Sequence, residues 1–334
     1  MPDLRVGDLV EVKSCEEILA TLDAKGALDA LPFMPEMLKY CGQQYRVYKR
    51  ADKTAHYITV PDFRTRRMYG TVHLEGLRCD GEYHDACDAL CLLYWKEAWL
   101  KKVDGTAGCP LSEKDKTTIQ VDGSTASDGT ACKLQALYSA TKISGNEQNQ
   151  GSDRYTCQVT EVFKASSSLD KWDVRQYYRD LASGNVSFKL FAKWVPLAIS
   201  NAVYERINGC RIYPFLDNRL VQREKTPYET LNLQVGDYVH IKSLKEILLT
   251  LDVNLRNRGL MFTKELVPYC GKTAKVIKIV KRIVNEIDGK MLCFSNNCII
   301  LEDVICTGYI SDKRLFCPKS CYPYWREIWL RKIQ

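Results

Sequence analysis

The amino-acid sequence predicts an α+β fold, built from two duplicated small β-barrel domains with helical insertions and a central mixed segment. Three observations lead to this prediction. A long stretch near the start recurs near the end, each copy contains strand-like alternation and a capped short helix, and the part between the copies matches neither. With 334 residues, of which 46% are hydrophobic, the chain is long enough for two or three domains with buried cores.

The repeat begins with "LRVGDLVEVKSCEEILATLD" at residues 4–23, which matches "LQVGDYVHIKSLKEILLTLD" at residues 233–252. It continues through "PFMPEMLKYCG" against "MFTKELVPYCG" and "HLEGLRC" against "ILEDVIC", and ends with "CDALCLLYWKEAWL" against "CPKSCYPYWREIWL". The matches are too long for chance and indicate an internal duplication. They predict a first barrel repeat at 1–103, a central segment of loops and helices at 104–228, and a second barrel repeat at 229–334.

Each copy opens with a predicted strand, because Val10 and Val12 lie two apart and would share one face. A short helix follows, with Ser14 as its cap and Glu17 three residues later, the pattern of a capping box. The next strands are predicted at residues 44–50 and 274–284, after the turns "YCG". Small, strongly bent barrels suit short strands of this kind.

The central segment predicts two helices. Asp173 is placed to cap the first, and Gly184 is placed to end it. The second, at residues 188–207, is amphipathic and interrupted by Pro196. We interpret it as a kinked core helix, with attachment to a membrane surface as the alternative.

The order of elements in each copy resembles the small barrel of the nitrile hydratase beta subunit: a G-D-x-V strand, a loop with an aromatic and a proline, a tyrosine-containing glycine turn, a valine-rich strand and a final W-x-x-x-W-L. The metal ligands of that enzyme lie in its other subunit, and no C-x-x-C-S-C stretch occurs here, so nitrile hydration is not implied. The pattern "YCG" followed by "FCPKSCYPYWREIWL" also resembles uncharacterised bacterial proteins that are often associated with biosynthetic gene clusters, a resemblance that suggests origin rather than activity.

The chain contains fifteen cysteines, which calls for an explanation in the compartment that the sequence predicts. The start "MPDLRVGDLVEVKS" lacks the layout of a signal peptide, and no apolar run is long enough to span a bilayer. We therefore expect a cytoplasmic protein without a membrane span. Thiols stay reduced there, so clustered cysteines favour metal or cluster ligation over a disulfide framework.

The candidate metal ligands come from all three segments. The first copy has the spacing C-x7-C-x3-C and the second has C-x10-C-x3-C, with further cysteines upstream of the second motif and in the centre. Thiolates bind soft metals, and they are ligands of zinc sites and of iron–sulfur clusters. The predicted ligands are Cys79, Cys87, Cys91, Cys109, Cys132, Cys157, Cys298, Cys306, Cys317 and Cys321.

Buried packing is the alternative interpretation of these thiols. If residues 87–99 form a helix, Cys87 and Cys91 lie one turn apart under the tryptophans, as core residues also would. In the second copy, prolines make a continuous helix unfavourable after residue 317. His84, beside an aspartate in "EYHDACD", is interpreted as an exposed loop residue, and Cys41 and Cys270 are interpreted as structural turn residues.

The favoured function is a thiolate-ligated metalloprotein, with an iron–sulfur cluster, that transfers electrons or acts as a redox accessory protein or enzyme in a biosynthetic pathway with a protein partner. The alternative is a zinc-stabilised scaffold or binding module for a protein or nucleic acid, and a third possibility is a metal-free protein. No common catalytic motif is present, and catalytic residues stay unassigned. A net charge of +7, spread along the chain, disfavours nucleic acid as the partner.

Overall fold

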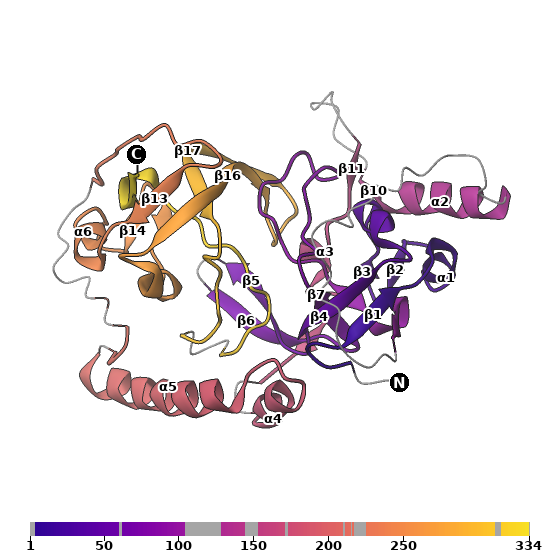
Figure 1. The fold of residues 1–334 in the computed structure, drawn as a ribbon, viewed down its shortest axis with the longest axis horizontal. Coiled ribbons are helices and arrows are strands. Elements are labelled where there is room, and N and C mark those ends of the chain that lie inside the picture. The colour runs from indigo at the N-terminus through magenta and orange to yellow at the C-terminus, as the bar shows by residue number, and fades with distance from the viewer. Residues whose placement is uncertain are drawn as a thin grey trace.

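The computed structural model describes residues 4–59, 62–103, 128–143, 153–170, 173–209, 211–214, 216, 225–310 and 315–333, and it shows a mixed α+β protein (Figure 1). The predicted α+β class is therefore confirmed. Antiparallel strands dominate both repeats, and most of the helical residues lie in the segment between them.

The first repeat contains β1 (Leu9–Val12), α1 (Cys15–Leu19), β2 (Ala27–Leu28), β3 (Leu31–Pro32), η1 (Pro35–Tyr40), β4 (Gln44–Arg50), β5 (Thr54–Thr59), β6 (Asp62–Arg67), β7 (Thr71–Leu74), β8 (Trp95–Lys96), η2 (Glu97–Trp99) and β9 (Leu100–Lys102). The second repeat contains β13 (Tyr238–Ile241), α6 (Leu244–Leu248), β14 (Arg256–Asn257), β15 (Leu260–Met261), η3 (Lys264–Tyr269), β16 (Thr273–Val284), β17 (Met291–Leu301), η4 (Glu327–Trp329) and β18 (Leu330–Lys332). Between them lie α2 (Asp128–Thr141), β10 (Lys142–Ile143), β11 (Arg154–Tyr155), α3 (Gln158–Glu161), β12 (Ser167–Ser168), α4 (Arg175–Ala182) and α5 (Phe188–Asn208).

The local patterns in the sequence produce the elements that they predict. Val10 and Val12 on β1 are fully buried, as the alternation requires. The Ser14 side chain accepts a hydrogen bond from the backbone N–H of Glu17, whose carboxylate accepts one from the N–H of Ser14, so the capping box is formed. The second copy repeats it with Ser243. These reciprocal bonds satisfy donors that a helix end otherwise leaves free.

The two repeats share their strand pairing. β1 pairs antiparallel with β4 and β9, and β13 pairs antiparallel with β16 and β18. The first sheet has the order β8-β7-β4-β1-β9 and the second has β17-β16-β13-β18. The edge strands of the first sheet are β8 and β9, and only η2 separates them along the chain. The sheet therefore curves so that its two edges approach each other. Among the described strands, β8 and β9 do not pair, so the sheet is not a closed barrel.

Each repeat places its cysteine-containing loop on the other repeat. The first cysteine loop, residues 79–91, contacts β16, where the backbone N–H groups of Lys281 and Arg282 donate to Asp88 Oδ2 at 2.9 and 3.2 Å. The second cysteine loop, residues 306–321, receives the reciprocal contact, because Lys53 Nζ donates to the carbonyl oxygen of Leu315 at 2.8 Å. The two repeats therefore interlock.

Residues 87–96 contain no helix, and only Glu97–Trp99 form a short 3-10 helix, η2. The backbone N–H of Cys79 donates to the carbonyl oxygen of Cys91 at 2.8 Å, and the N–H of Asp88 donates to Arg282 at 2.9 Å. The backbone groups of this stretch therefore form hydrogen bonds across the loop and to the second repeat, not to residues four positions away as in a helix. In the second copy, Cys306 donates to Cys321 in the same way, also at 2.8 Å.

Helix α5 forms as predicted, but it is not a core helix. Ile199, Val203 and Ile207, on its outer face, are 60, 55 and 75% exposed. Its other face packs against Phe316 through Phe191 and neighbouring residues, so it lies along the surface (Figure 1). In the part of the chain that the structure describes, no helix has the length and apolar character needed to cross a membrane.

His73 on β7 gives a pH-dependent contribution to stability. The imidazole is fully buried against Tyr94, and burial lowers its pKa from 6.5 to about 4. Between pH 6.5 and about 4, His73 is therefore protonated in the unfolded chain but neutral in the folded chain. The free energy of unfolding consequently decreases as pH falls below 6.5. Urea unfolding of wild type should show a loss of about 2 kcal/mol between pH 7 and pH 5 that His73→Gln lacks, given 1.36 kcal/mol per pKa unit. Equal pH dependence in the two proteins would contradict this.

Candidate metal centre

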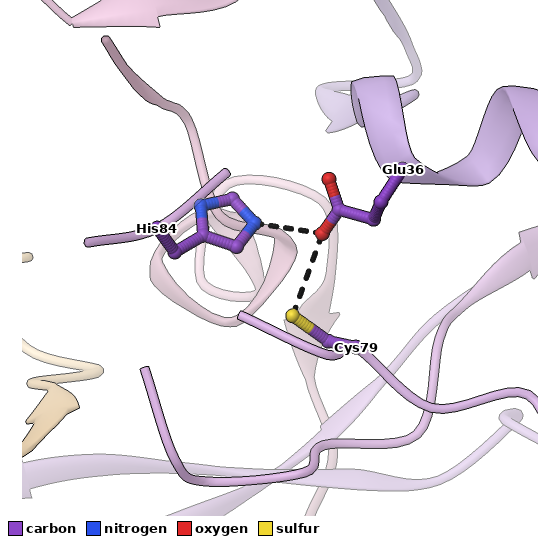
Figure 2. A group of neighbouring side chains, drawn as sticks. All are labelled: Glu36, Cys79 and His84. Carbon is purple, nitrogen blue, oxygen red and sulfur yellow. Dashed lines mark hydrogen bonds and ion pairs between the residues drawn. The ribbon is translucent and has the colours of Figure 1, made fainter. Parts of the chain in front are cut away.

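Glu36, Cys79 and His84 converge in the interior of the first repeat (Figure 2). Glu36 comes from η1, and the other two come from the first cysteine loop. One potential ligand atom from each lies within 4.8 Å of the others, and all three residues are buried. Within the described ranges, this is the one set of three or more His, Cys, Asp or Glu side chains that meets such a distance.

Two consecutive turns shape the loop that carries Cys79 and His84. Gly81 has φ +82°, a conformation that favours glycine. The backbone N–H of His84 donates to the carbonyl oxygen of Gly81 at 3.0 Å, and that of Cys87 donates to His84 at 3.1 Å. The tight path turns the thiol and the imidazole toward η1, where Glu36 follows Pro35 at the start of the 3-10 helix.

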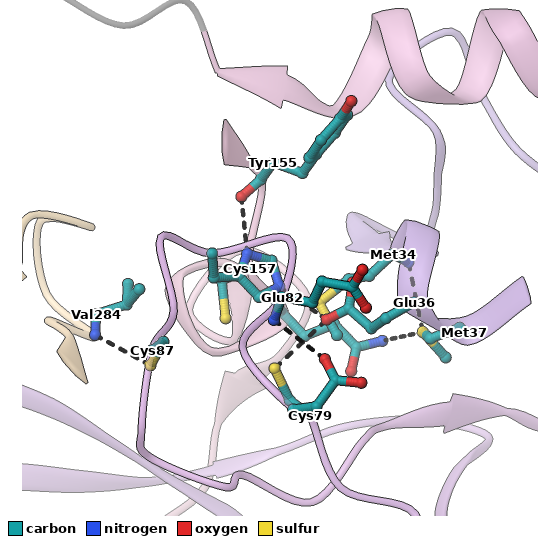
Figure 3. A network of polar contacts seen from close by, with 12 residues as sticks. Met34, Glu36, Met37, Cys79, Glu82, Cys87, Tyr155, Cys157 and Val284 are labelled. Atoms are coloured by element: carbon teal, nitrogen blue, oxygen red, sulfur yellow. Dashed lines mark hydrogen bonds and ion pairs between the residues drawn. The ribbon is translucent and has the colours of Figure 1, made fainter. Parts of the chain in front are cut away.

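The imidazole of His84 is held in a definite orientation. Its Nδ1 lies 3.0 Å from the carbonyl oxygen of Tyr155, which can only accept a hydrogen bond, so Nδ1 carries a proton (Figure 3). Nε2 points at Glu36 Oε1, 2.8 Å away. Metal-binding histidines commonly donate one ring N–H to a carbonyl oxygen and present the other nitrogen to the metal. His84 shows the first of these two features, and its Nε2 lies against Glu36 Oε1 in the structure.

The carboxylate of Glu36 is incompletely satisfied by the protein. Its Oε1 is shared by His84 Nε2 and by Cys79 Sγ, which lies at 3.4 Å. Its Oε2 is buried, and among the described residues it has no hydrogen-bond partner. An orphaned buried acceptor costs about 1–3 kcal/mol, and a cation at the centre of the group would remove that cost. A carboxylate, an imidazole and a thiol together suit zinc.

Cys157 is the neighbouring thiol that could complete four-coordination. It is buried at the start of α3 and projects toward the same group of side chains (Figure 3). Burial raises the pKa of Cys79, and the nearby Cys157 and Glu36 charges raise it further. Both thiols therefore favour the protonated form unless a cation offsets the negative charge.

The remaining predicted ligands of the first repeat and the centre have different surroundings. The thiol of Cys87 accepts from the N–H of Val284 at 3.3 Å and joins the loop to β16. Cys91 is half-buried, and its pKa is raised by burial and by the charges of Cys321, Glu286 and other thiols. Cys132 on α2 is exposed, apart from the group, and Cys109 lies outside the described residues.

The predicted ligands of the second repeat do not form the same centre. Cys317 is buried, and Cys306 and Cys321 are half-buried. Cys298 on β17 is contacted at 3.4 Å by the guanidinium of Arg326. These thiols thus lie in the junction and in the second core.

A basic residue of the central segment lies near the corresponding position of the second repeat. Glu265 corresponds to Glu36 in the repeat, and it is likewise buried. Burial lowers the pKa of Arg211, and the charges of Glu205, with which it forms an ion pair at 3.4 Å, and of Glu265 oppose this shift. A guanidinium thus lies near the carboxylate that the second copy retains, and the two copies are not equivalent.

Two residues of this group, His84 and Glu36, were not predicted as ligands from the sequence. His84 was expected to be exposed, but it is fully buried because Tyr155 and Glu36 bind both of its nitrogens. Glu36 was not predicted, although an acid lies at this position in both "PFMPEMLKYCG" and "MFTKELVPYCG". No protein-family model, curated protein or solved structure matches this chain.

Proposed function

We propose that the chain is a zinc-stabilised scaffold protein, with one metal ion held by Glu36, Cys79 and His84. The observation that supports this most strongly is the convergence of three different donor atoms within 4.8 Å around a buried carboxylate whose Oε2 has no hydrogen-bond partner among the described residues. Zinc would supply a positive charge that fastens these side chains together. Cys157 is the proposed fourth ligand.

The proposed ion connects separate parts of the fold. Glu36 belongs to η1, Cys79 and His84 to the first cysteine loop, and Cys157 to the segment after β11. The same loop is anchored to the second repeat through Cys87 and Asp88. Metal binding would therefore stabilise the first repeat, the central segment and their junction with the second repeat at once.

We also propose that the two repeats are small bent barrels that arose by duplication, with bounds of 1–103 and 229–334 around a central segment at 104–228. Support comes from the shared order of elements and from matching registers. Val47 pairs with Leu74 on β7, as Val276 pairs with Leu301 on β17. The second copy then lost metal binding, with Arg211 as the cation near its retained carboxylate.

Elemental analysis of protein purified without oxygen tests the proposal. Wild type should contain close to one zinc per chain, and Cys79→Ser should lose most of it and unfold at lower temperature. Chelation of wild type should lower its melting temperature toward that of the variant, because binding energy contributes to folding energy.

The matched control is Cys306→Ser, which removes the corresponding thiol of the second repeat and should keep the zinc. Zinc retained in Cys79→Ser, or lost equally in both variants, would refute the assignment. A variant that fails to fold is replaced by His84→Gln, which preserves size and one hydrogen-bonding group.

An iron–sulfur protein is the second candidate, and the buried thiols at the junction favour it. Cys91 lies near Cys321, Cys157 and Cys87, whose charges raise its pKa after burial. Thiolates from both repeats could thus share one cluster. In this candidate the protein transfers electrons to a protein partner in a redox or biosynthetic pathway. Iron and sulfide in the same elemental analysis, lost in Cys91→Ser, would favour it over zinc.

A further inference from the structure

Cys15 and Cys41 are brought together at one end of the first sheet. Cys15 begins α1, directly after β1, and Cys41 follows η1. The backbone N–H of Val12 donates to the carbonyl oxygen of Gln43 at 2.9 Å, and that of Gly42 donates to Val12 at 2.8 Å. The chain before Cys15 is thereby held against the chain after Cys41.

The two side chains meet beside a shared carbonyl group. Cys15 Sγ lies 4.0 Å from the carbonyl oxygen of Leu38, to which the backbone N–H of Cys41 donates at 3.1 Å. The Cys15 and Cys41 side chains lie close enough for each to shift the acidity of the other, and both are half-buried, so small molecules in solvent can reach the pair. Neither residue belongs to the proposed metal centre.

The contact also separates the acidities of the two thiols. The hydrogen bond with Cys41 lowers the pKa of Cys15 to about 7, and the same bond raises the pKa of Cys41. The second repeat provides a comparison, because Leu244 replaces Cys15 there and burial raises the pKa of Cys270 to about 11. A thiolate attacks oxidants far faster than a thiol does. Cys15 is therefore the nucleophile of the pair.

We propose that Cys15 and Cys41 form an oxidisable dithiol, a modification site that hydrogen peroxide converts to a disulfide. The Cys15 thiolate attacks one peroxide oxygen, the O–O bond breaks, and hydroxide leaves, giving a sulfenic acid on Cys15. The sulfur of Cys41 then attacks the Cys15 sulfur, an S–S bond forms, the S–O bond breaks, and water leaves with the Cys41 proton. The two thiols lose two electrons in total, and one peroxide is reduced to two waters.

This site goes beyond the metal-binding role and does not require it. A disulfide would tie the start of α1 to the end of η1, the 3-10 helix that carries Glu36. Oxidation would therefore stiffen the wall of the metal centre from its far side.

Peptide mapping of the full-length, metal-loaded protein after brief treatment with hydrogen peroxide tests the proposal. Under non-reducing conditions, the peptides that contain Cys15 and Cys41 should appear cross-linked, with a mass two hydrogens below their sum. Cys41→Ser should instead accumulate sulfenic acid on Cys15, which dimedone traps. Without peroxide, Cys15 should also alkylate at least about tenfold faster than Cys270 at pH 7. About half of Cys15 is thiolate there, against about one part in ten thousand of Cys270, and the lower nucleophilicity of the more acidic thiolate offsets only part of this difference.

Cys270→Ser is the matched control and should leave the cross-link unchanged. The proposal is overturned if Cys15 and Cys41 stay reduced at a peroxide dose that already oxidises the exposed Cys132 and Cys293. It is also overturned if Cys15 overoxidises in wild type without forming the cross-link. Zinc content is measured in parallel, so failure of the dithiol and failure of the metal assignment give different results.

Discussion

Gly81→Ala is expected to lower the free energy of unfolding by about 3–5 kcal/mol, and to release the zinc ion that we propose binds there. An added Cβ at Gly81 would lie 2.0 Å from the carbonyl oxygen of Cys87 and 2.8 Å from its nitrogen, and the φ of +82° is unfavourable for alanine. Both contacts are with backbone, so the loop must move, and Cys79 and His84 move with it. Urea unfolding and zinc analysis measure the two effects.

Alanine substitutions at two other glycines distinguish backbone strain from a steric clash of the added Cβ. Gly7 has φ +88° with nothing within 4 Å of an added Cβ, so Gly7→Ala should cost only about 1–2 kcal/mol. At Gly308, in the second cysteine loop, an added Cβ would lie 2.7 Å from the nitrogen of Cys317. Gly308→Ala should therefore destabilise the protein without affecting the proposed zinc site. Equal losses in Gly81→Ala and Gly7→Ala would show that Gly81 is not packed against Cys87.

Lys53→Met is expected to cost about 3–5 kcal/mol, because it leaves a buried carboxylate without its counter-charge. Lys53 Nζ lies 2.6 Å from Asp180 Oδ2, and the two side chains are 2% and 3% exposed. Burial raises the pKa of Asp180 to about 6 although Lys53 opposes the shift. The folded chain thus holds this proton more tightly than the unfolded chain, whose carboxyl has a pKa near 3.8.

The sign of the pH dependence follows from that comparison. The stability due to Asp180 protonation is present below pH 3.8 and is lost as pH rises through about 6. Without Lys53 the pKa of the carboxyl rises further, so the variant should regain stability on acidification over a wider range than wild type. Urea unfolding across this range measures the difference.

The double variant Lys53→Met/Asp180→Leu is the control. Apolar groups of similar size often replace a buried ion pair with little loss, so the double variant should recover most of the stability. Additive losses from the two substitutions would mean that the residues act independently, contrary to the short contact between them.

Local features of the fold were predictable because they depend on neighbours in sequence. The strand at Gln44–Arg50 and the box of Ser14 and Glu17 appear where the pattern places them. The path of the cysteine loops was not predictable. Cys87 and Asp88 bond to residues nearly 200 positions away, and such contacts leave no periodic signal. Because of these long-range hydrogen bonds, the residues around Cys91 do not form the helix that the sequence suggested.

The candidate site was partly predictable for a related reason. Cys79 was predicted as a ligand because thiolates are distinctive, whereas Glu36 resembles any other acid until the fold places it in the interior. His84 looked exposed because its neighbours are polar, but the turn at Gly81 directs it inward. Sequence spacing alone cannot show which side chains of an irregular loop point into the protein interior.

The interlocking of the repeats sets an order of events during synthesis. The thiol of Cys87 is bonded by Val284, 197 positions later in the chain. At ribosomal rates of about 5–20 residues per second, roughly 10–40 s separate the appearance of these two residues. Throughout that interval the first cysteine loop has no contact with β16, because β16 has not yet been synthesised. If the proposed metal ion binds early at Glu36, Cys79 and His84, it would keep the loop in shape until β16 emerges, and metal supply would then determine the folding yield.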